Sequence, residues 1–159
     1  MEFRNARPSD YEQLVSVVDA WWGGRDMATI LPRQFLEHFN DTSFVAEQNG
    51  LIAGFLVGYQ PPSHPYIGYV HFIGVHPEHR RHGIAGWLYK IFAGELKKRG
   101  ARVISGITAD INKLSQAAHR GMGFKFKDSD TVIDSIPVHL DYDGKGRHRV
   151  IFYKNMEDF

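Results

Sequence analysis

The stretch His76–Ala85, with the sequence His-Pro-Glu-His-Arg-Arg-His-Gly-Ile-Ala, combines basic side chains with the start of a predicted helix. The first N–H groups of a helix have no partner within it and lie at the positive end of its dipole, so this turn suits a phosphate group. Gly83 lets the backbone approach an anion closely, and Arg80 and Arg81 can donate charge-assisted hydrogen bonds. The alternative is a solvated basic turn that only caps the helix.

Residue types exclude several other chemistries. The chain contains neither GxxxxGK followed by Ser or Thr nor a GxGxxG after a strand, so the two commoner phosphate motifs are absent. It has no cysteine and no GxSxG, which argues against an acyl-enzyme. The three histidines of the basic turn lack thiolate companions, and His139, Asp141 and Asp143 lack the further ligands of a calcium loop. We therefore predict no metal site.

Length and composition set the scale of the molecule. The 159 residues, 43% of them hydrophobic, suffice for one core, so we predict a single domain over residues 1–159. A net charge of +1 argues against a nucleic-acid partner. The lack of cysteine fits a reducing compartment, and no segment approaches the ~18 apolar residues of a membrane span, so we expect a cytoplasmic protein with no membrane anchor.

Hydrophobic periodicity and turn signals predict the elements that position these residues. We expect four helices, which begin at a capping box of Ser9 and Glu12, near Pro32, at Gly83 and at an Asp110 cap. Asn49-Gly50 indicates a hairpin turn. The predicted strands are Phe3–Ala6, Ser43–Gln48, Leu51–Tyr59, Tyr66–Val75, Arg102–Thr108, Phe124–Lys127 and Arg149–Lys154. This order indicates a mixed α/β domain with a largely antiparallel sheet.

Two sequence blocks together resemble the GNAT superfamily of N-acetyltransferases. Arg80-Arg-His-Gly-Ile-Ala85 is similar to the family's acetyl-CoA signature, in which Gln or Arg is followed by two residues, Gly, one residue and Gly or Ala. Asn112-Lys-Leu-Ser-Gln-Ala-Ala-His-Arg-Gly-Met-Gly-Phe124 resembles the family's helix that ends in Gly-Phe. The blocks stand the usual distance apart, and the predicted order of elements agrees across the whole chain.

The resemblance implies a fold and a cofactor site. The expected fold is a seven-stranded, largely antiparallel sheet flanked by about four helices, with a fourth strand, Ile67–Val75, splayed from the fifth. The pantetheine arm of acetyl-CoA would lie in the gap against backbone groups of the fourth strand, and the amides of the turn would hold the pyrophosphate. The implied cofactor-binding residues are Ile73, Val75, Arg80, Arg81, His82, Gly83, Ile84, Ala85, Gly86, Asn112 and Ser115.

His71 is the residue that we expect to act as general base. A primary amine has a pKa of ~10.4 and is almost entirely protonated at neutral pH, so acetyl transfer to it needs a base that removes a proton. Imidazole titrates near neutral pH and suits this role. Strict strand alternation puts His71 on the same sheet face as Ile73 and Val75. Some aralkylamine members of the family carry a histidine here. The alternative is a histidine hydrogen-bonded within the sheet beside Tyr69 and Phe72.

His119 departs from the family pattern, because the family usually has a tyrosine at this place, seven residues after the asparagine. A protonated histidine could give a proton to the leaving CoA thiolate, with Tyr89 or Tyr69 as substitutes. A thiolate with a pKa near ~8.5 is a fair leaving group without an acid. We expect direct attack in a ternary complex. The alternative is a non-catalytic acyl-CoA-binding module.

The acceptor site is predicted from the longer segment between the last two strands. Residues 128–148 carry a cluster of aspartates, including Asp141 and Asp143, and Ile136-Pro-Val138 could anchor the segment. These carboxylates could attract a cationic amine, whether a small molecule or a peptide; the alternative is a solvated loop. The resemblance implies that Trp22 and Arg25 border the acceptor site, because the family's first helix and the loop after it lie there, and Tyr69 completes the predicted acceptor residues. A homodimer is compatible with the sequence.

Overall fold

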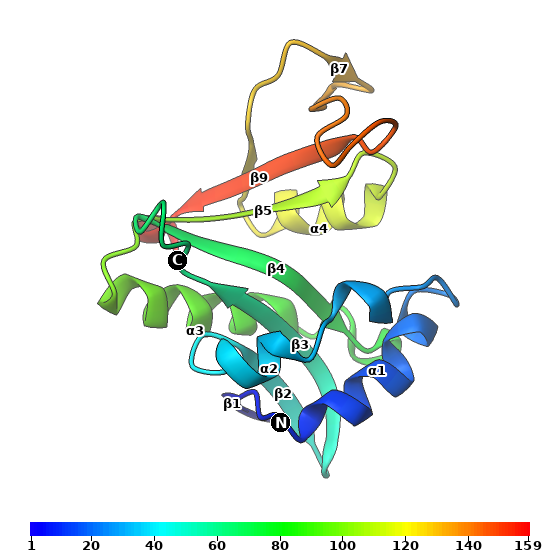
Figure 1. Ribbon diagram of the computed structural model, residues 1–159, viewed down its shortest axis with the longest axis vertical. Helices are drawn as coiled ribbons and strands as arrows, with labels where there is room; N and C mark the ends of the chain where they lie inside the picture. Colours follow the sequence, from blue (N-terminus) through cyan, green and yellow to red (C-terminus); the bar gives the residue numbers. More distant parts are fainter.

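The computed structural model describes residues 1–159 and contains a seven-stranded sheet of order β1-β2-β3-β4-β5-β9-β6 (Figure 1). All neighbouring strands are antiparallel except β4 and β5, which are parallel. The predicted mixed α/β fold with a largely antiparallel sheet is therefore confirmed. The strands are β1 (Glu2–Asn5), β2 (Phe44–Gln48), β3 (Leu51–Tyr59), β4 (Ile67–Val75), β5 (Val103–Ala109), β6 (Lys125–Phe126) and β9 (Arg149–Asn155).

Four helices flank the sheet, namely α1 (Asp10–Trp21), α2 (Gln34–His38), α3 (Ile84–Lys98) and α4 (Lys113–Gly121). Two of the predicted caps are wrong. Ser9 makes no side-chain cap, because the Asp10 carboxylate instead accepts from the Arg7 N–H and pairs with Arg4. Asn112, rather than Asp110, caps α4. No helix is long and apolar enough to cross a membrane.

Both faces of the central strands are buried. One cluster joins α3 to the sheet and includes Leu56, Val70 and Phe92. A second cluster joins α1 and α2 to the opposite face and includes Phe55 and Val57. Because Phe55, Leu56 and Val57 alternate between the two clusters, β3 reads in the sequence as an unbroken apolar run.

Strands β4 and β5 separate halfway along their length (Figure 1). They pair only from Ile67↔Val103 to Val70↔Gly106, whereas β5 continues to pair with β9 to its end. Gly106 lies where the strands part, and a Cβ there would come within 2.5 Å of the Phe152 ring and 2.9 Å of the Val70 carbonyl oxygen. The splayed arrangement of these two strands is confirmed.

The segment between β6 and β9 is ordered around a small hairpin, β7 (Val132–Ile133) and β8 (Ile136–Pro137). Ile136 and Val138 are buried against Val150 of β9, which confirms the predicted apolar anchor. The following residues fold back toward β9, since His139 forms an isolated bridge with Arg149.

Candidate active site

The basic turn between β4 and α3 presents a row of free backbone N–H groups. A 3-10 turn, η2 (Pro77–His79), leads into Arg81 with φ 66° and Gly83 with φ 79°, both left-handed, and α3 begins at Ile84. None of the six N–H groups in the range 81–86 donates a hydrogen bond within the chain. Unpaired donors at the positive end of a fifteen-residue helix form an anion-binding site. The turn therefore has the geometry expected for a phosphate cradle.

Arg80 differs from its predicted role as a phosphate ligand. Its guanidinium donates to the Trp21 carbonyl oxygen at 2.5 Å and to the Val75 carbonyl oxygen at 3.2 Å. The cation therefore lies against the C-terminal end of α1, where the helix dipole favours it. Arg80 ties the turn to α1 and β4, which leaves the exposed Arg81 as the arginine free to meet a phosphate.

The free edge of β4 supplies further backbone groups beside the gap. The His76 N–H, just after β4, donates to the carbonyl of Ala53 in β3, so these two residues are a hydrogen-bonded pair between the strands. Because such pairs alternate along antiparallel strands, the N–H and C=O groups of Ile73 and Val75 point away from β3. These groups face the gap, where the Val75 carbonyl oxygen accepts from Arg80, so the Val75 N–H and the two Ile73 groups are the ones placed to meet an extended ligand.

A β-bulge sets the direction of His71. The β3–β4 register passes from Gly58↔Val70 to Val57↔Phe72, which leaves His71 as the extra residue. The predicted alternation is therefore wrong. Ile73 and Val75 pack against the α3 cluster, whereas the His71 ring stacks on Phe35 of α2, with 4.2 Å between ring centroids.

The surroundings of His71 suit a neutral base. Nε2 lies 2.6 Å from the Ile30 carbonyl oxygen, which can only accept, so Nε2 carries the proton and Nδ1 of the neutral ring keeps its lone pair. Burial lowers the pKa of His71 below its usual value, and the Ile30 hydrogen bond opposes this shift only in part. The ring is therefore neutral at pH 7 and ready to accept a proton at Nδ1.

His119 is a buried, neutral histidine rather than the predicted protonated acid. Its Nδ1–H donates to the Ser115 carbonyl at 2.7 Å, and its Nε2 accepts from the Tyr89 hydroxyl at 2.8 Å. The ring also stacks on Phe152 with centroids 3.8 Å apart. Burial lowers its pKa to about 4, so the ring carries no charge at neutral pH. Tyr89 is itself fully buried, and burial raises its pKa.

The burial of neutral His119 predicts that acid lowers the stability of the folded protein. The unfolded chain protonates His119 near pH 6.5 and the folded chain only near about 4, so stability present above pH 6.5 is lost as the pH falls toward 4. The loss approaches about 3 kcal/mol. Urea unfolding from pH 7 to 4.5 should show a flatter pH dependence in His119→Gln than in wild type, whereas His64→Gln, at an exposed site, should keep the wild-type slope. Equal slopes in all three proteins would contradict the assignment.

Asn112 and Ser115 are engaged with each other at the start of α4. The Asn112 Oδ1 accepts from the Ser115 N–H at 3.1 Å, and the Ser115 hydroxyl lies 3.2 Å from His119 Nδ1. The remaining Asn112 amide N–H groups make no hydrogen bond within the chain. Contact of these two residues with a cofactor stays a prediction.

Two of the predicted acceptor residues, Trp22 and Tyr69, lie on the α1–α2 face. Trp22 packs on Phe72 with 5.1 Å between ring centroids, and Tyr69 packs on Tyr59 at 5.6 Å. Burial raises the pKa of Tyr69, and Tyr142 and Asp143 of the 139–148 loop add to the rise, so this loop lies near Tyr69. Arg25 is exposed and forms no side-chain hydrogen bond or ion pair with them.

The carboxylates of Asp141 and Asp143 already have partners within or next to the loop. Asp143 pairs with Arg149 Nε at 2.6 Å. Asp141, with φ 51°, accepts from the Gly146 N–H at 2.7 Å, and its own N–H donates to His148 Nδ1. Sequence reasoning missed Arg149, the first residue of β9, as the partner of Asp143, although it lies only six residues later in the chain.

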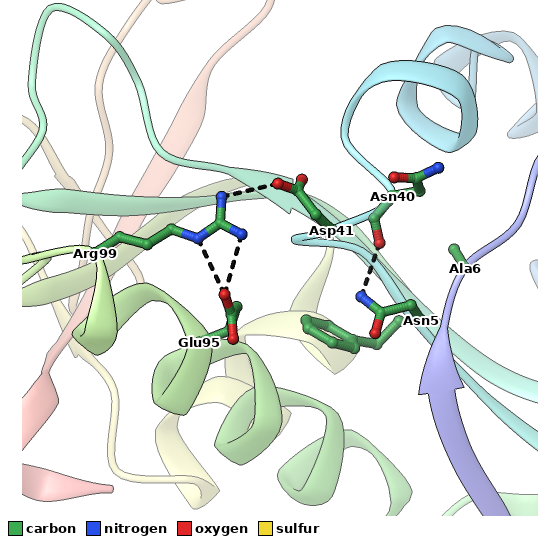
Figure 2. A pocket seen from close by; sticks show the side chains of 7 residues that line it. Asn5, Ala6, Asn40, Asp41, Glu95 and Arg99 are labelled. Atoms are coloured by element: carbon green, nitrogen blue, oxygen red, sulfur yellow. Dashed lines mark hydrogen bonds and ion pairs between the residues drawn. The ribbon is translucent and has the colours of Figure 1, made fainter.

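A surface hollow lies away from these residues, near the C-terminal end of α3. It has a volume of about 500 Å³, and Figure 2 shows Arg99 between Asp41 and Glu95 at its wall. Asn5 donates across it to the Asn40 carbonyl. Its charged side chains satisfy one another, so it offers no group poised for catalysis. No group of three or more His, Cys, Asp or Glu side chains is arranged to hold a metal ion.

Comparison with known proteins decides the family. The family model described as "Acetyltransferase (GNAT) family" matches residues 4–124, which include the whole basic turn and α4. The chain belongs to the GNAT family. Its relatives include an L-2,4-diaminobutyric acid acetyltransferase of Vibrio parahaemolyticus, 28% identical over 81 residues. That match spans 51% of this chain and 43% of the relative, which is less than half of its length.

Solved GNAT structures share the fold over nearly the whole chain. Diaminobutyrate acetyltransferase from Paenibacillus lautus, in complex with L-2,4-diaminobutyric acid and coenzyme A, has a TM-score of 0.75 and 21% identity, with 99% of this chain and 95% of that chain covered. Ribosomal-protein-alanine N-acetyltransferase from Brucella melitensis has a TM-score of 0.72 and 19% identity, with 98% and 99% covered. At these identities the likeness establishes the fold.

Proposed function

We propose that this GNAT protein transfers an acetyl group from acetyl-CoA to a primary amine. The observation that carries the proposal is the row of six free N–H groups in the range 81–86, at the end of the splayed strand β4. These donors suit a pyrophosphate, and the free edge at Ile73 and Val75 suits the amide groups of a pantetheine arm. Two family relatives are themselves acetyltransferases that act on amines.

The proposed reaction is direct attack in a ternary complex. The neutral form of the reacting amine attacks the thioester carbonyl, His71 Nδ1 takes the proton that the nitrogen then carries in excess, and collapse of the tetrahedral intermediate expels the CoA thiolate. The neutral His119 cannot supply a proton, because its Nδ1–H is bound to the Ser115 carbonyl and its Nε2 accepts from Tyr89. Departure of the thiolate therefore needs no acid from the protein, consistent with its low basicity.

The acceptor is proposed to be a cationic amine, small or peptide-borne. Tyr69 and Tyr59 form an aromatic wall on the same sheet face as the His71 ring, and the Asp143 carboxylate, which pairs with Arg149, lies near this wall. Aromatic faces and carboxylates both attract ammonium groups. L-2,4-Diaminobutyric acid, the substrate of one structural relative, carries two amino groups and fits this class. Asp141 is engaged within the loop as well, where its carboxylate accepts from the Gly146 N–H.

A CoA-release assay tests this function. The purified protein should release free CoA from acetyl-CoA only when an amine is present, and diamines should give a higher kcat/KM than neutral amines of equal length. Asp143→Asn should raise KM for the diamine about 3-fold to 10-fold and leave KM for acetyl-CoA unchanged. Lys127→Gln, a change of surface charge outside the loop, is the control. Acetyl-CoA binding without amine-dependent release would favour the non-catalytic module, which none of the comparisons supports.

Three further expectations stay predictions. They are a single domain over residues 1–159, a cytoplasmic location and a homodimer.

A further inference from the structure

We infer that Asp19, at the end of α1, is a positioning residue that holds the Ile30 carbonyl oxygen against the His71 ring. The Asp19 carboxylate hydrogen-bonds only to the N–H groups of Met27 and Ala28, neither of them a predicted cofactor or acceptor residue, so the side chain acts through the segment between α1 and α2. The catalytic consequence rests on the proposed function, in which His71 is the base.

Asp19 hydrogen-bonds to the segment that connects α1 to α2. One carboxylate oxygen, Oδ1, accepts hydrogen bonds from the backbone N–H groups of both Met27 and Ala28, each at 2.8 Å. These two groups open the 3-10 turn η1 (Ala28–Ile30), whose first N–H groups have no partner within the turn. The carboxylate therefore closes a loop of about ten residues onto the end of α1.

The turn η1, which follows these hydrogen bonds, is itself held in place. Ile30 donates to the Met27 carbonyl at 3.1 Å, and Leu31 donates to the Ala28 carbonyl at 3.0 Å. Leu31 is fully buried in the α1–α2 cluster. The peptide unit that bears the Ile30 carbonyl is thus fixed by the turn on one side and by a buried side chain on the other.

The Ile30 carbonyl links this turn to the base. The Ile30 oxygen lies 2.6 Å from His71 Nε2, and Phe35 stacks on the ring, so two contacts define the ring's orientation. Because Nε2 is committed to Ile30, the lone pair of the neutral ring stays on Nδ1. A shift of the turn would free the ring to rotate, and misplacing a reacting group by about 1 Å can cost up to about 10²-fold in rate.

The distinguishing measurement is nuclear magnetic resonance of the His71 ring. An Nε2-bound proton held by a carbonyl exchanges slowly and gives a visible ¹H–¹⁵N signal, assigned by its loss in His71→Gln. We expect Asp19→Ala to remove this signal and to lower kcat about 10-fold while KM for acetyl-CoA stays unchanged. Asp19→Asn keeps the accepting Oδ1 and should retain both signal and rate.

Asp26→Ala is the matched control, because Asp26 lies in the same segment, is exposed and makes no side-chain hydrogen bond. All variants are compared well below their melting temperatures, so that loss of the signal reports on the ring. Persistence of the Nε2–H signal in Asp19→Ala would overturn the inference, as would an Asp19→Asn protein that behaves like Asp19→Ala. If His71→Gln keeps full activity, the base role fails, whereas the signal still decides the role of Asp19.

Discussion

Gly83→Asp is expected to weaken acetyl-CoA binding by about 10²-fold, which corresponds to losing roughly one charge-assisted hydrogen bond and adding a repulsion. Gly83 has φ 79° and precedes the first residue of α3, in the middle of the free N–H groups. A Cβ at Gly83 would meet no atom within 4 Å, so the folded chain has room for the side chain. The loss therefore comes from a carboxylate placed where the phosphates must approach. Isothermal titration calorimetry with acetyl-CoA measures it directly.

Gly83→Asn separates charge from backbone strain. Asparagine tolerates the left-handed conformation and has nearly the same shape as aspartate but no charge. We expect Gly83→Asn to weaken binding less than about 10-fold, and the difference between the two variants should shrink as salt is added. If both variants bind acetyl-CoA like the wild type, the turn is a solvated helix cap and the proposed cofactor site is wrong.

The phosphate turn could be predicted from the sequence because its determinants are local. Glycine at residue 83, the basic residues before it and the apolar spacing of α3 lie within about twenty residues, and the left-handed φ of Gly83 follows from the same segment. The Asn49-Gly50 hairpin was predictable for the same reason, and both of its residues have positive φ.

The directions of individual side chains could not be predicted, because they depend on partners far along the chain. The bulge at His71 arises from the register between β3 and β4, which no pattern within β4 specifies. Arg80 turns toward the Trp21 carbonyl, 59 residues away, and His119 meets Tyr89, 30 residues away. In each case the sequence shows a polar or basic side chain, but the group that this side chain contacts, and for His119 its protonation state, depend on tertiary packing.

The bulge changes what the gap between β4 and β5 can do. With strict alternation, His71 would share a face with Ile73 and Val75 and would point toward α3, where the core leaves no room for an acceptor. The extra residue turns the ring to the α1–α2 face instead, where it stacks on Phe35, which also packs against Tyr59 of the aromatic wall. The strand can thus present backbone groups to a cofactor arm at its edge and a base to an amine on one face.

His71→Gln should lower kcat by roughly 10² at neutral pH and leave acetyl-CoA affinity nearly unchanged, the size expected for a lost general base. Glutamine can still donate from Nε2 to the Ile30 carbonyl, so this change removes the lone pair of Nδ1 with the least disturbance of the turn. His71→Ala should give a similar loss, and His64→Gln, at an exposed site, should not.

The pH dependence of kcat/KM gives a second criterion for the role of His71. Because burial lowers the pKa of His71, wild-type kcat/KM should fall only as the pH drops below about 6.5, when the imidazole becomes protonated, and His71→Gln should lack this acidic limb. An unchanged kcat in both variants, or an acidic limb that persists in His71→Gln, would show that water or another residue takes the proton.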